Sequence, residues 1–448
     1  MTEHCEHIRP LAHVPNPDPT ELPDRAAALD RLAEVLDSGA PETTTVVAIV
    51  DIDRLAAVND ALGHDVGDRL LVSTAKRLAG AIRPDDVIAR TGDDEFVVAC
   101  TGLADDAAAT EFGDRIRRAL TGRLAVGDVD WDVSVSVGVT VAGPDAFEPS
   151  RPAHRRAQEV VSHAHTAMRA AKQRGRARSV RFDDELARRA RLRTELAAAL
   201  PRAWRGGQLE LDYQPIFSAV DERPEGAEAL LRWNHPTHGR LEAHEFVEVA
   251  EETGAIVPIG DWVLDRACES LRSLIEAEAV DTQFSMHVNA TRLQLATPTF
   301  VDRLLESVDD HGLAPGHLVV EIRAACFVDH DAVEVLRSVG ALRDAGVQIA
   351  IDNFGTGSEA LSLLTEIGAD VLKLDGGLAL PAGSSETDMR VVRALVSLAH
   401  ALDMQVVAGR VTGLEQLRRL RAAGCDLVQG NLLGPPAPLS ELRPRMER

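Results

Sequence analysis

The sequence is poor in aromatic residues, and it lacks long apolar runs, paired cysteines and an excess of positive charge. Only 3% of its 448 residues are aromatic while 45% are hydrophobic, so its cores must consist mostly of Ala, Val and Leu. No apolar run approaches the ~18 residues of a membrane span, and the N-terminus lacks a signal-peptide pattern. The five cysteines show no paired spacing, which predicts free thiols in a reducing compartment. We therefore expect a cytoplasmic protein without a membrane span.

The charge and the length limit the function further. A formal charge of -23 argues against a surface that coats nucleic acid, although a few local arginines could still hold a small anionic ligand. At about 150 residues per domain, the length predicts two or three domains. Residues 1–16 are expected to form an irregular tail. Its His4-Cys5-Glu6-His7 could bind a metal in principle, but a flexible acidic tail is the favoured interpretation.

Residues 17–182 have the pattern of an α+β domain. The expected helices are 22–36, 56–62, 67–81 and 153–173, and the expected strands are 43–52, 87–90, 96–100 and 131–141. Strands 87–90 and 96–100 should form a hairpin whose turn carries acidic residues. A charged, Ala-rich helix over 183–200 follows, and it either connects two domains rigidly or covers the surface of the second.

Residues 201–446 repeat a β-run followed by a helix, which predicts a TIM-like α/β barrel. The β-runs end in the side chains Glu228 and Arg232, Asn289, Glu321, Asp352, and Lys373 with Asp375. Catalytic groups gathered from the carboxyl ends of successive strands are typical of such barrels. Strand ends are often polar, but this explains one or two such residues rather than a whole set of metal-ligand and acid/base types.

Acidic residues of the first part stand at the end of strand 43–52 and in the hairpin turn. Nucleotidyl transfer needs such a pair of points because two metal ions must bridge a triphosphate and an attacking hydroxyl. The motifs around them are Asp18-Pro19-Thr20-Glu21-Leu22-Pro23-Asp24-Arg25, Asp51-Ile52-Asp53, Asn59-Asp60, Gly67-Asp68, Gly92-Asp93-Asp94-Glu95-Phe96, and Lys172 with Gly175-Arg176. Together they resemble the GGDEF diguanylate cyclase family.

This resemblance implies roles for the matching residues. Asp51 and Glu95 would be the metal ligands, and Asp94 would help to activate the 3′-hydroxyl. Asn59 and Asp68 would bind guanine. Lys172 and Arg176 would contact the phosphates. Asp93, however, replaces the second glycine of the motif and adds a side chain and a negative charge beside the phosphates. Leu55 and Ala56 replace a Phe-Lys pair. We therefore expect no cyclase activity, while weak GTP binding stays open.

Arg83-Pro84-Asp85-Asp86 precedes Gly92 at the offset of the family's RxxD inhibitory site. The resemblance implies that Arg83 and Asp86 contact cyclic di-GMP there, since arginine gives bidentate contacts to phosphate or guanine. A simple surface pair of Arg83 and Asp86 is the alternative.

The second part carries a further set of motifs. They are Tyr213-Gln214-Pro215-Ile216, Glu228-Ala229-Leu230-Leu231-Arg232-Trp233, Val288-Asn289, Asp352 with Phe354-Gly355-Thr356-Gly357, Lys373 with Asp375, and Gln429-Gly430. They resemble the EAL phosphodiesterase family, in which two metal ions activate a water that cuts cyclic di-GMP. The resemblance implies metal ligands Glu228, Asn289, Glu321 and Asp352, a water-positioning Lys373, and substrate contacts Gln214, Arg232 and Gln429.

Several acidic positions of the EAL motifs are absent. Asn353 replaces the second Asp of Asp-Asp-Phe-Gly. Gly409 and Thr412 replace both carboxylates of Ala-Glu-Gly-Val-Glu, whose glycine is Arg410 here, and Arg323-Ala324-Ala325 replaces Thr-Glu-Ser. Mg²⁺ needs oxygen ligands and compensating charge, so these changes should cripple a two-metal site.

Three functions remain open at this point. The leading hypothesis is a catalytically impaired GGDEF–EAL protein that acts as a receptor or effector for cyclic di-GMP or GTP. The alternatives are a weakly active cyclic di-GMP phosphodiesterase, which would use Mg²⁺ or Mn²⁺, and a non-enzymatic scaffold. We expect an unknown protein partner and no nucleic acid, and the sequence leaves a homodimer open.

Overall fold

The computed structural model describes residues 18–38, 44–103, 106–126, 129–143, 151–327, 332–354, 361–374, 377–378 and 384–446. The N-terminal tail with His4–His7, the segment Gly355–Gly357 and Asp375 lie outside these described residues. The chain divides into two compact units, Met1–Leu192 and Arg193–Arg448. Helix α6, Asp184–Ala203, contains the unit boundary and runs three residues further than expected.

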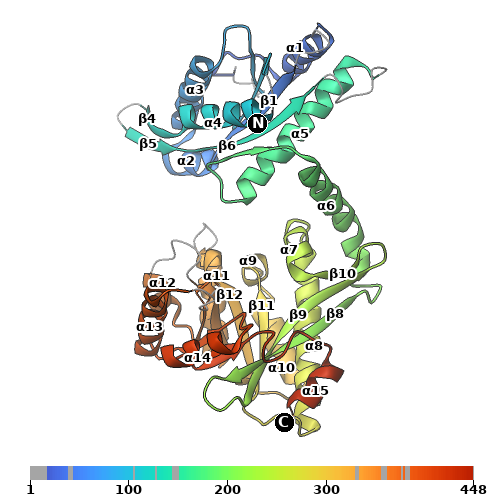
Figure 1. Ribbon diagram of the computed structural model, residues 1–448, viewed down its shortest axis with the longest axis vertical. Coiled ribbons are helices and arrows are strands. Elements are labelled where there is room, and N and C mark those ends of the chain that lie inside the picture. The colour runs from blue at the N-terminus through green and yellow to red at the C-terminus, as the bar shows by residue number, and fades with distance from the viewer. Residues whose placement is uncertain are drawn as a thin grey trace, which may run out of the picture. The chain divides into compact units, whose positions relative to one another are not determined.

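The first unit, drawn in blue to green in Figure 1, is built on a five-stranded sheet. The order of its strands is β2-β3-β1-β6-β7. Its strands are β1 Thr45–Ile52, β2 Val87–Arg90, β3 Glu95–Thr101, β6 Val135–Ala142 and β7 Ser179–Arg181. Its helices are α1 Arg25–Ser38, α2 Leu55–Leu62, α3 His64–Ala81, α4 Asp106–Leu120 and α5 Ala153–Gln173. The predicted hairpin of β2 and β3 is confirmed, with Arg90 opposite Phe96.

Strand β1 lies at the centre of this sheet and is buried throughout. Its alternate residues serve two cores, as the two-residue period of a strand requires. Val46, Ala48 and Val50 pack with residues of α2, α3 and α4, while Val47 and Ile49 pack with residues of α1 and α5. The β-branched run therefore produces a sheet covered by helices on both faces.

Helix α5 lies directly against strand β6 because Gly138 has no side chain. A Cβ at Gly138 would lie 2.0 Å from the backbone nitrogen of Met168 and 2.1 Å from the carbonyl oxygen of Ala164. No side chain can be accommodated at such distances. This close contact fixes the position of the end of α5, which carries Lys172.

The expected single strand 131–141 is wrong. The chain forms β5, Val129–Val133, which pairs with β4, Gly122–Val126, in a separate hairpin, and then β6 in the main sheet. The break falls at Ser134, whose carbonyl accepts a hydrogen bond from the Asp53 backbone and whose hydroxyl donates to the Asp53 carboxylate at 2.7 Å. Alternation continues through this residue, so the pattern did not reveal that the chain changes sheets.

The second unit is the expected TIM-like barrel, with eight strands in the closed order β8-β9-β11-β12-β13-β14-β15-β16. These strands are β8 Leu209–Ser218, β9 Pro224–His235, β11 Ser285–Ala290, β12 Leu318–Arg323, β13 Gln348–Phe354, β14 Val371–Leu374, β15 Gln405–Ala408 and β16 Leu427–Gln429. Strand β8 is antiparallel to both of its neighbours, unlike the strands of a regular TIM barrel. Strand β10, Gly239–Glu242, extends the sheet beside β9.

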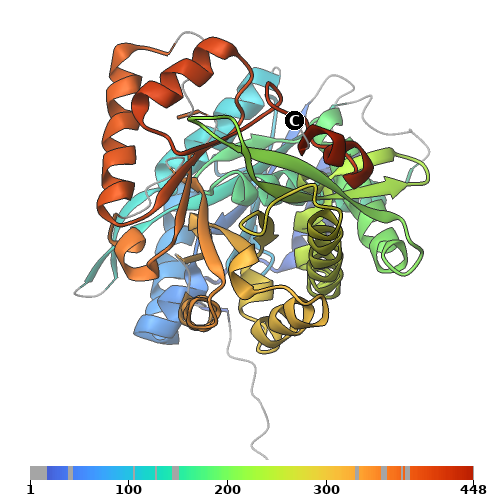
Figure 2. The same cartoon turned by 90° about the horizontal axis from the view of Figure 1, so that it is seen from below.

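Helices surround the barrel strands, as the yellow to red part of Figure 2 shows. They are α7 Ala243–Glu252, α8 Ile256–Glu276, α9 Arg292–Leu295, α10 Phe300–Asp310, α11 Ala332–Asp344, α12 Leu361–Ile367, α13 Glu386–Ala401, α14 Leu414–Ala423 and α15 Leu439–Met446. Their apolar faces and the outward faces of the strands form the largest core among the described residues. Among the described helices, none is long and apolar enough to cross a membrane.

Candidate functional site

The interior of the barrel gathers most of the residues predicted for the second site. The lower interior layer consists of Ile216, Val319, Ala350, Val371, Val407 and Leu427. Every second residue of a strand points to the same face, so the next inward residue lies two positions further along each parallel strand. Those residues are Glu321, Asp352, Lys373, Gly409 and Gln429, and Gln214 takes the matching place on antiparallel β8.

Lys373 projects into this layer and contacts two carboxyl groups. Its ammonium group donates to Glu321 Oε1 and Oε2 at 2.6 Å each and to Glu228 Oε2 at 2.9 Å. Glu228 also accepts from Asn289 Nδ2 at 2.8 Å and from Gln429 Nε2 at 2.9 Å. Five of the predicted residues thus form one hydrogen-bonded cluster in which the protein itself supplies the positive charge.

Burial and this single cation set the proton affinities in the cluster. Burial raises the pKa of Glu228, but the charge and hydrogen bond of Lys373 outweigh it and lower that pKa to about 2. Burial and the charge of Glu228 raise the pKa of Glu321 to about 8. Burial lowers the pKa of Lys373, but the surrounding carboxylates raise it by more than burial lowers it. The net pKa therefore lies above the usual value for lysine, and the ammonium stays charged. Burial also raises the pKa of Asp352 to about 6.

The remaining barrel residues predicted to contact substrate are engaged within the protein. Arg232 Nε donates to Asp212 Oδ2 at 2.9 Å, and Arg240 Nη2 donates to Asp212 Oδ1 at 2.6 Å. Asp212 and Arg232 are both buried. Gln214 Nε2 donates to the carbonyl oxygen of Gly434 at 3.2 Å. Arg232 therefore has a structural role in a buried ion pair whatever else it contacts.

The first unit places its two predicted metal ligands opposite each other. Asp51 is the penultimate residue of β1 and Glu95 begins β3, and the two residues are register partners. Lys172, from the end of α5, lies 2.6 Å from Asp51 Oδ2, and His165 Nδ1 lies 3.1 Å from Glu95 Oε2. Burial raises the pKa of Asp51 to about 6. Asp51 Oδ1 is buried without a hydrogen-bond partner, so one carboxylate oxygen stays available to a ligand.

The predicted guanine readers and phosphate contacts of this unit lie around that pair. Asn59 on α2 lies against Gly67 of α3, since a Cβ at position 67 would lie 1.9 Å from Asn59 Oδ1. This oxygen is buried without a hydrogen-bond partner. Asp68 is half-buried on α3. Arg176 is exposed after α5, and its backbone adopts the left-handed region with φ +56°.

The acidic turn between β2 and β3 is braced by Arg90. Its guanidinium donates to the carbonyl oxygens of Gly92 at 3.1 Å and Asp93 at 2.8 Å, and to Asp18 Oδ1 at 2.7 Å. Asp93 itself is exposed, and Asp94 is half-buried. The turn therefore keeps a fixed shape, with the Asp93 side chain directed to solvent.

The RxxD segment forms a tight turn that leaves its arginine exposed. The Asp86 carboxylate accepts the backbone N–H of Arg83 at 2.8 Å, and the Asp86 N–H donates to the Arg83 carbonyl at 3.1 Å. Among the described residues, no carboxylate forms an ion pair with the Arg83 guanidinium. The structure therefore shows no pair between the side chains of Arg83 and Asp86, which was the alternative.

The comparisons with known proteins identify the family. A model described as "EAL domain" matches residues 197–436, which is more than half of the chain. The chain belongs to the EAL family. A second model, "Diguanylate cyclase, GGDEF domain", matches residues 18–178, so the chain is a GGDEF–EAL tandem.

Named relatives share both domains. "Bifunctional diguanylate cyclase/cyclic di-GMP phosphodiesterase MucR" of Pseudomonas aeruginosa is 34% identical over 94% of this chain and 60% of its own length. The chain thus spans about half to two thirds of the length of the curated relatives it matches. The solved structure "PaMucR Phosphodiesterase, c-di-GMP complex" is 37% identical over 55% of this chain and 99% of that chain, with a TM-score of 0.52. "Vibrio cholerae LapD S helix-GGDEF-EAL (bound to c-di-GMP)" covers 93% of this chain and 95% of that chain at 20% identity, with a TM-score of 0.63, and shares the fold.

GGDEF and EAL domains generally use divalent metal ions, and the residues of this tandem fit such ions poorly. Among the described residues, no three His, Cys, Asp or Glu side chains come together in a group that could hold a metal. In the EAL domain, the Lys373 ammonium already lies between Glu228 and Glu321. Asn353 is neutral and adopts the left-handed region with φ +55°, and Gly409 brings no side chain to the interior. A reaction step through two metal ions is therefore not supported by these residues.

Sequence reasoning missed three residues that hold the site residues in place. His287 Nδ1 lies 2.8 Å from Glu321 Oε1 in the EAL domain, where burial lowers the pKa of His287 to about 3. Asp212 anchors Arg232, and His165 contacts Glu95 in the GGDEF domain. His287 and Asp212 stand two residues before Asn289 and Gln214, so strand alternation could have placed them on the inward face.

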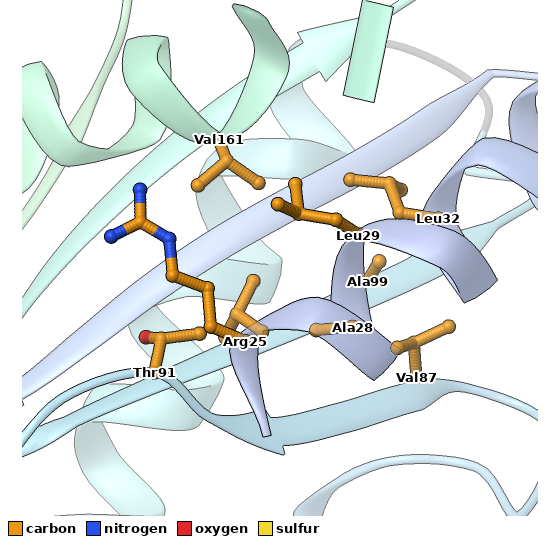
Figure 3. Close-up of a pocket in the computed structure, with 9 residues that line it drawn as sticks. Arg25, Ala28, Leu29, Leu32, Val87, Thr91, Ala99 and Val161 are labelled. Carbon is orange, nitrogen blue, oxygen red and sulfur yellow. The ribbon is translucent and has the colours of Figure 1, made fainter. Parts of the chain in front are cut away.

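A small cavity in the GGDEF domain is too small for a nucleotide (Figure 3). It lies between α1, α5 and the sheet and measures about 10 Å³, which is about the room that one water needs. Leu29, Leu32 and Val161 line it together with Arg25, whose guanidinium lies at the left edge of the view. This cavity is a packing defect beside the acidic turn and carries no ligand chemistry.

Proposed function

We propose that this GGDEF–EAL tandem is a receptor for cyclic di-GMP whose two catalytic centres are impaired. The observation that carries the proposal is the loss of two acidic side chains at the mouth of the EAL barrel, where Asn353 is neutral and Gly409 brings no side chain. Mg²⁺ needs oxygen ligands and compensating charge, which these two positions no longer supply. Both structural relatives described above were solved with cyclic di-GMP, which supports this molecule as the ligand.

The GGDEF domain supports ligand binding rather than synthesis. Asp93 adds negative charge beside the turn that would meet the triphosphate, and Lys172 is paired with Asp51. The exposed guanidinium of Arg83 and the fixed Asp86 carboxylate, in contrast, offer a bidentate donor and an acceptor without any metal. We therefore propose that the segment Arg83–Asp86 contributes the stronger site, that this binding is independent of magnesium, and that GTP binds weakly.

Equilibrium titration with cyclic di-GMP in EDTA and in Mg²⁺ tests the proposal. Wild type should bind in both buffers, and Arg83→Ala should bind about tenfold more weakly or worse, because a lost charged contact costs ~1.5–3 kcal/mol. Gln214→Ala probes the barrel more safely than Arg232→Ala, which would leave Asp212 buried with Arg240 alone. Absence of micromolar binding by wild type would reject the receptor function and favour a scaffold.

A weakly active phosphodiesterase is the second candidate. The arrangement of Glu228, Asn289, Glu321 and Lys373 in one cluster favours it, as does the 37% identity to the structure described as "PaMucR Phosphodiesterase". The double variant Asn353→Asp with Gly409→Glu distinguishes the candidates. A Cβ at Gly409 would have Leu374 O as its nearest neighbour at 3.8 Å, so there is room for the start of a side chain. A large gain in hydrolysis would show that only these two carboxylates were missing.

A further inference from the structure

Arg323 extends the inward row of strand β12 to the mouth of the barrel. Val319 belongs to the interior layer, and Glu321 is bonded to Lys373 inside the barrel. Because side chains alternate along a strand, Arg323 lies on the same inward face, one layer closer to the opening. It is exposed and is the register partner of Asp352. Among the described residues, its guanidinium has no acceptor within hydrogen-bond distance and no ion-pair partner.

Arg410 brings a second cation to the same edge of the barrel. It follows Gly409 after strand β15 and adopts the left-handed region with φ +56°. Gln416 Nε2 donates to the Arg410 carbonyl at 3.3 Å and so helps to hold this backbone. The side chain is exposed and, within the described part of the chain, has no partner. An L-residue in this conformation is strained, typically by ~1 kcal/mol or more, which the fold tolerates here.

The ends of strands β12 and β15 lie three strand positions apart around the eight-stranded opening. Strands β13 and β14 separate them in the barrel order. At about 4.8 Å per strand, the two ends stand about 14 Å apart along the wall. This spacing suits two arginines that approach one ligand from different sides.

The charges at the mouth do not favour an ion of valence two. Lys373 lies against Glu228 and Glu321, and Arg323 is the register partner of Asp352. Mg²⁺ needs carboxylates that have no cation beside them already. An anionic group, in contrast, meets exposed guanidinium groups above a buried ammonium.

We propose that Arg323 and Arg410 turn the mouth of the barrel into a metal-independent site for the phosphate of a phosphodiester. Guanidinium groups bind phosphate through two parallel hydrogen bonds and stay charged at every physiological pH. Cyclic di-GMP as the specific ligand rests on the proposed function, whereas the phosphate site itself rests on the two arginines. The barrel then keeps an anion-binding mouth although it lacks a two-metal centre.

The test uses the full chain in EDTA with two probes, cyclic di-GMP and inorganic pyrophosphate. Arg323→Gln and Arg410→Gln remove the charge while they keep most of the side-chain length. Arg337→Ala, an exposed arginine on the outer helix α11, is the matched control. The Arg83→Ala background removes the expected contribution of the GGDEF domain, so that the titration reports the barrel. Each glutamine variant should weaken cyclic di-GMP binding about tenfold, and the control should not. Pyrophosphate should raise the Tm of wild type but not of the double glutamine variant.

The outcomes separate the two proposals. If cyclic di-GMP binds the barrel with equal affinity in all variants, the arginine site is overturned and the receptor function stands. If cyclic di-GMP does not bind wild type but pyrophosphate stabilises it in an Arg323-dependent manner, the receptor function fails and the phosphate site stands. If neither probe binds, both are wrong. If binding is lost in EDTA and returns with Mg²⁺, a metal rather than the arginines carries the phosphate.

Discussion

Replacement of Lys373 by methionine should strongly destabilise the EAL domain. The substitution keeps the apolar stem but removes the cation that lies 2.6 Å from Glu321 and 2.9 Å from Glu228. Both carboxylates are buried, so they are left without their counterion in a medium of low dielectric constant. Breaking a buried pair in this way costs about 3–5 kcal/mol. At ~2–4 °C per kcal/mol for a unit of this size, the Tm should fall by about 6–20 °C.

The loss of stability in the Lys373→Met variant should be larger at high pH than at low pH. In wild type, Lys373 holds the pKa of Glu228 at about 2, below its usual value. Without Lys373, burial raises the folded-state pKa of Glu228 above the ~4.3 of an unfolded chain, as it already does for Glu321 in wild type. The folded variant then binds more protons than the unfolded chain, so its stability falls as pH rises above ~4.3. The Tm difference from wild type should therefore be smaller at pH 5 than at pH 8.

Thermal unfolding followed by tryptophan fluorescence measures this effect, since Trp233 is fully buried in the EAL domain. Lys76→Met, at an exposed position on α3, is the matched control and should leave the Tm unchanged. Mg²⁺ added to the Lys373→Met variant should restore part of the lost stability, because a cation can then enter between the carboxylates. A Tm within 2 °C of wild type at both pH values, on the scale of ~2–4 °C per kcal/mol, would refute the counterion role of Lys373.

Five further outcomes are expected. Purified protein should form no cyclic di-GMP from GTP with Mg²⁺ or Mn²⁺, and product formation that Asp94→Ala abolishes would contradict this. Hydrolysis of cyclic di-GMP should be absent or far slower than that of an intact EAL enzyme, whereas a rate within tenfold of it, about 1.4 kcal/mol of barrier, would speak against impairment. Asn353→Asp with Gly409→Glu should raise whatever hydrolysis exists, and no change would point to another defect. Arg83→Ala should weaken cyclic di-GMP binding about tenfold in calorimetry without altering the Tm. Gly138→Ala should destabilise the GGDEF domain by more than 1–3 kcal/mol in urea unfolding, because its methyl group would overlap the backbone of α5; a smaller loss would mean that α5 can move away.

Much of the fold could be predicted from the sequence because its signals are local. The β-branched run of β1, the apolar period of α5 and the repeated β-run and helix of the barrel each predict one element directly. The break at Ser134 could not be predicted, because it depends on hydrogen bonds to Asp53, 81 residues away in the sequence. The antiparallel direction of β8 is equally invisible in its alternation, which is the same for both directions.

The candidate sites could likewise be predicted from the sequence only in part. Residues on strand ends, such as Glu321 and Lys373, were predicted to lie together, and they do. Their mutual pairing was not foreseen, because a motif names residue types and does not say which of them bond to each other. The engagement of Arg232 by Asp212 shows the same limit, since both partners come from one hairpin and the sequence assigned only one of them a role.

The lysines at the two acidic centres have a consequence for folding in the cell. The chain has three lysines, and two of them, Lys172 and Lys373, lie against the carboxylates at which metal ions would be expected. Each domain therefore carries its own counterion from synthesis onward. Folding and lifetime of the protein should consequently be insensitive to the magnesium and manganese supply.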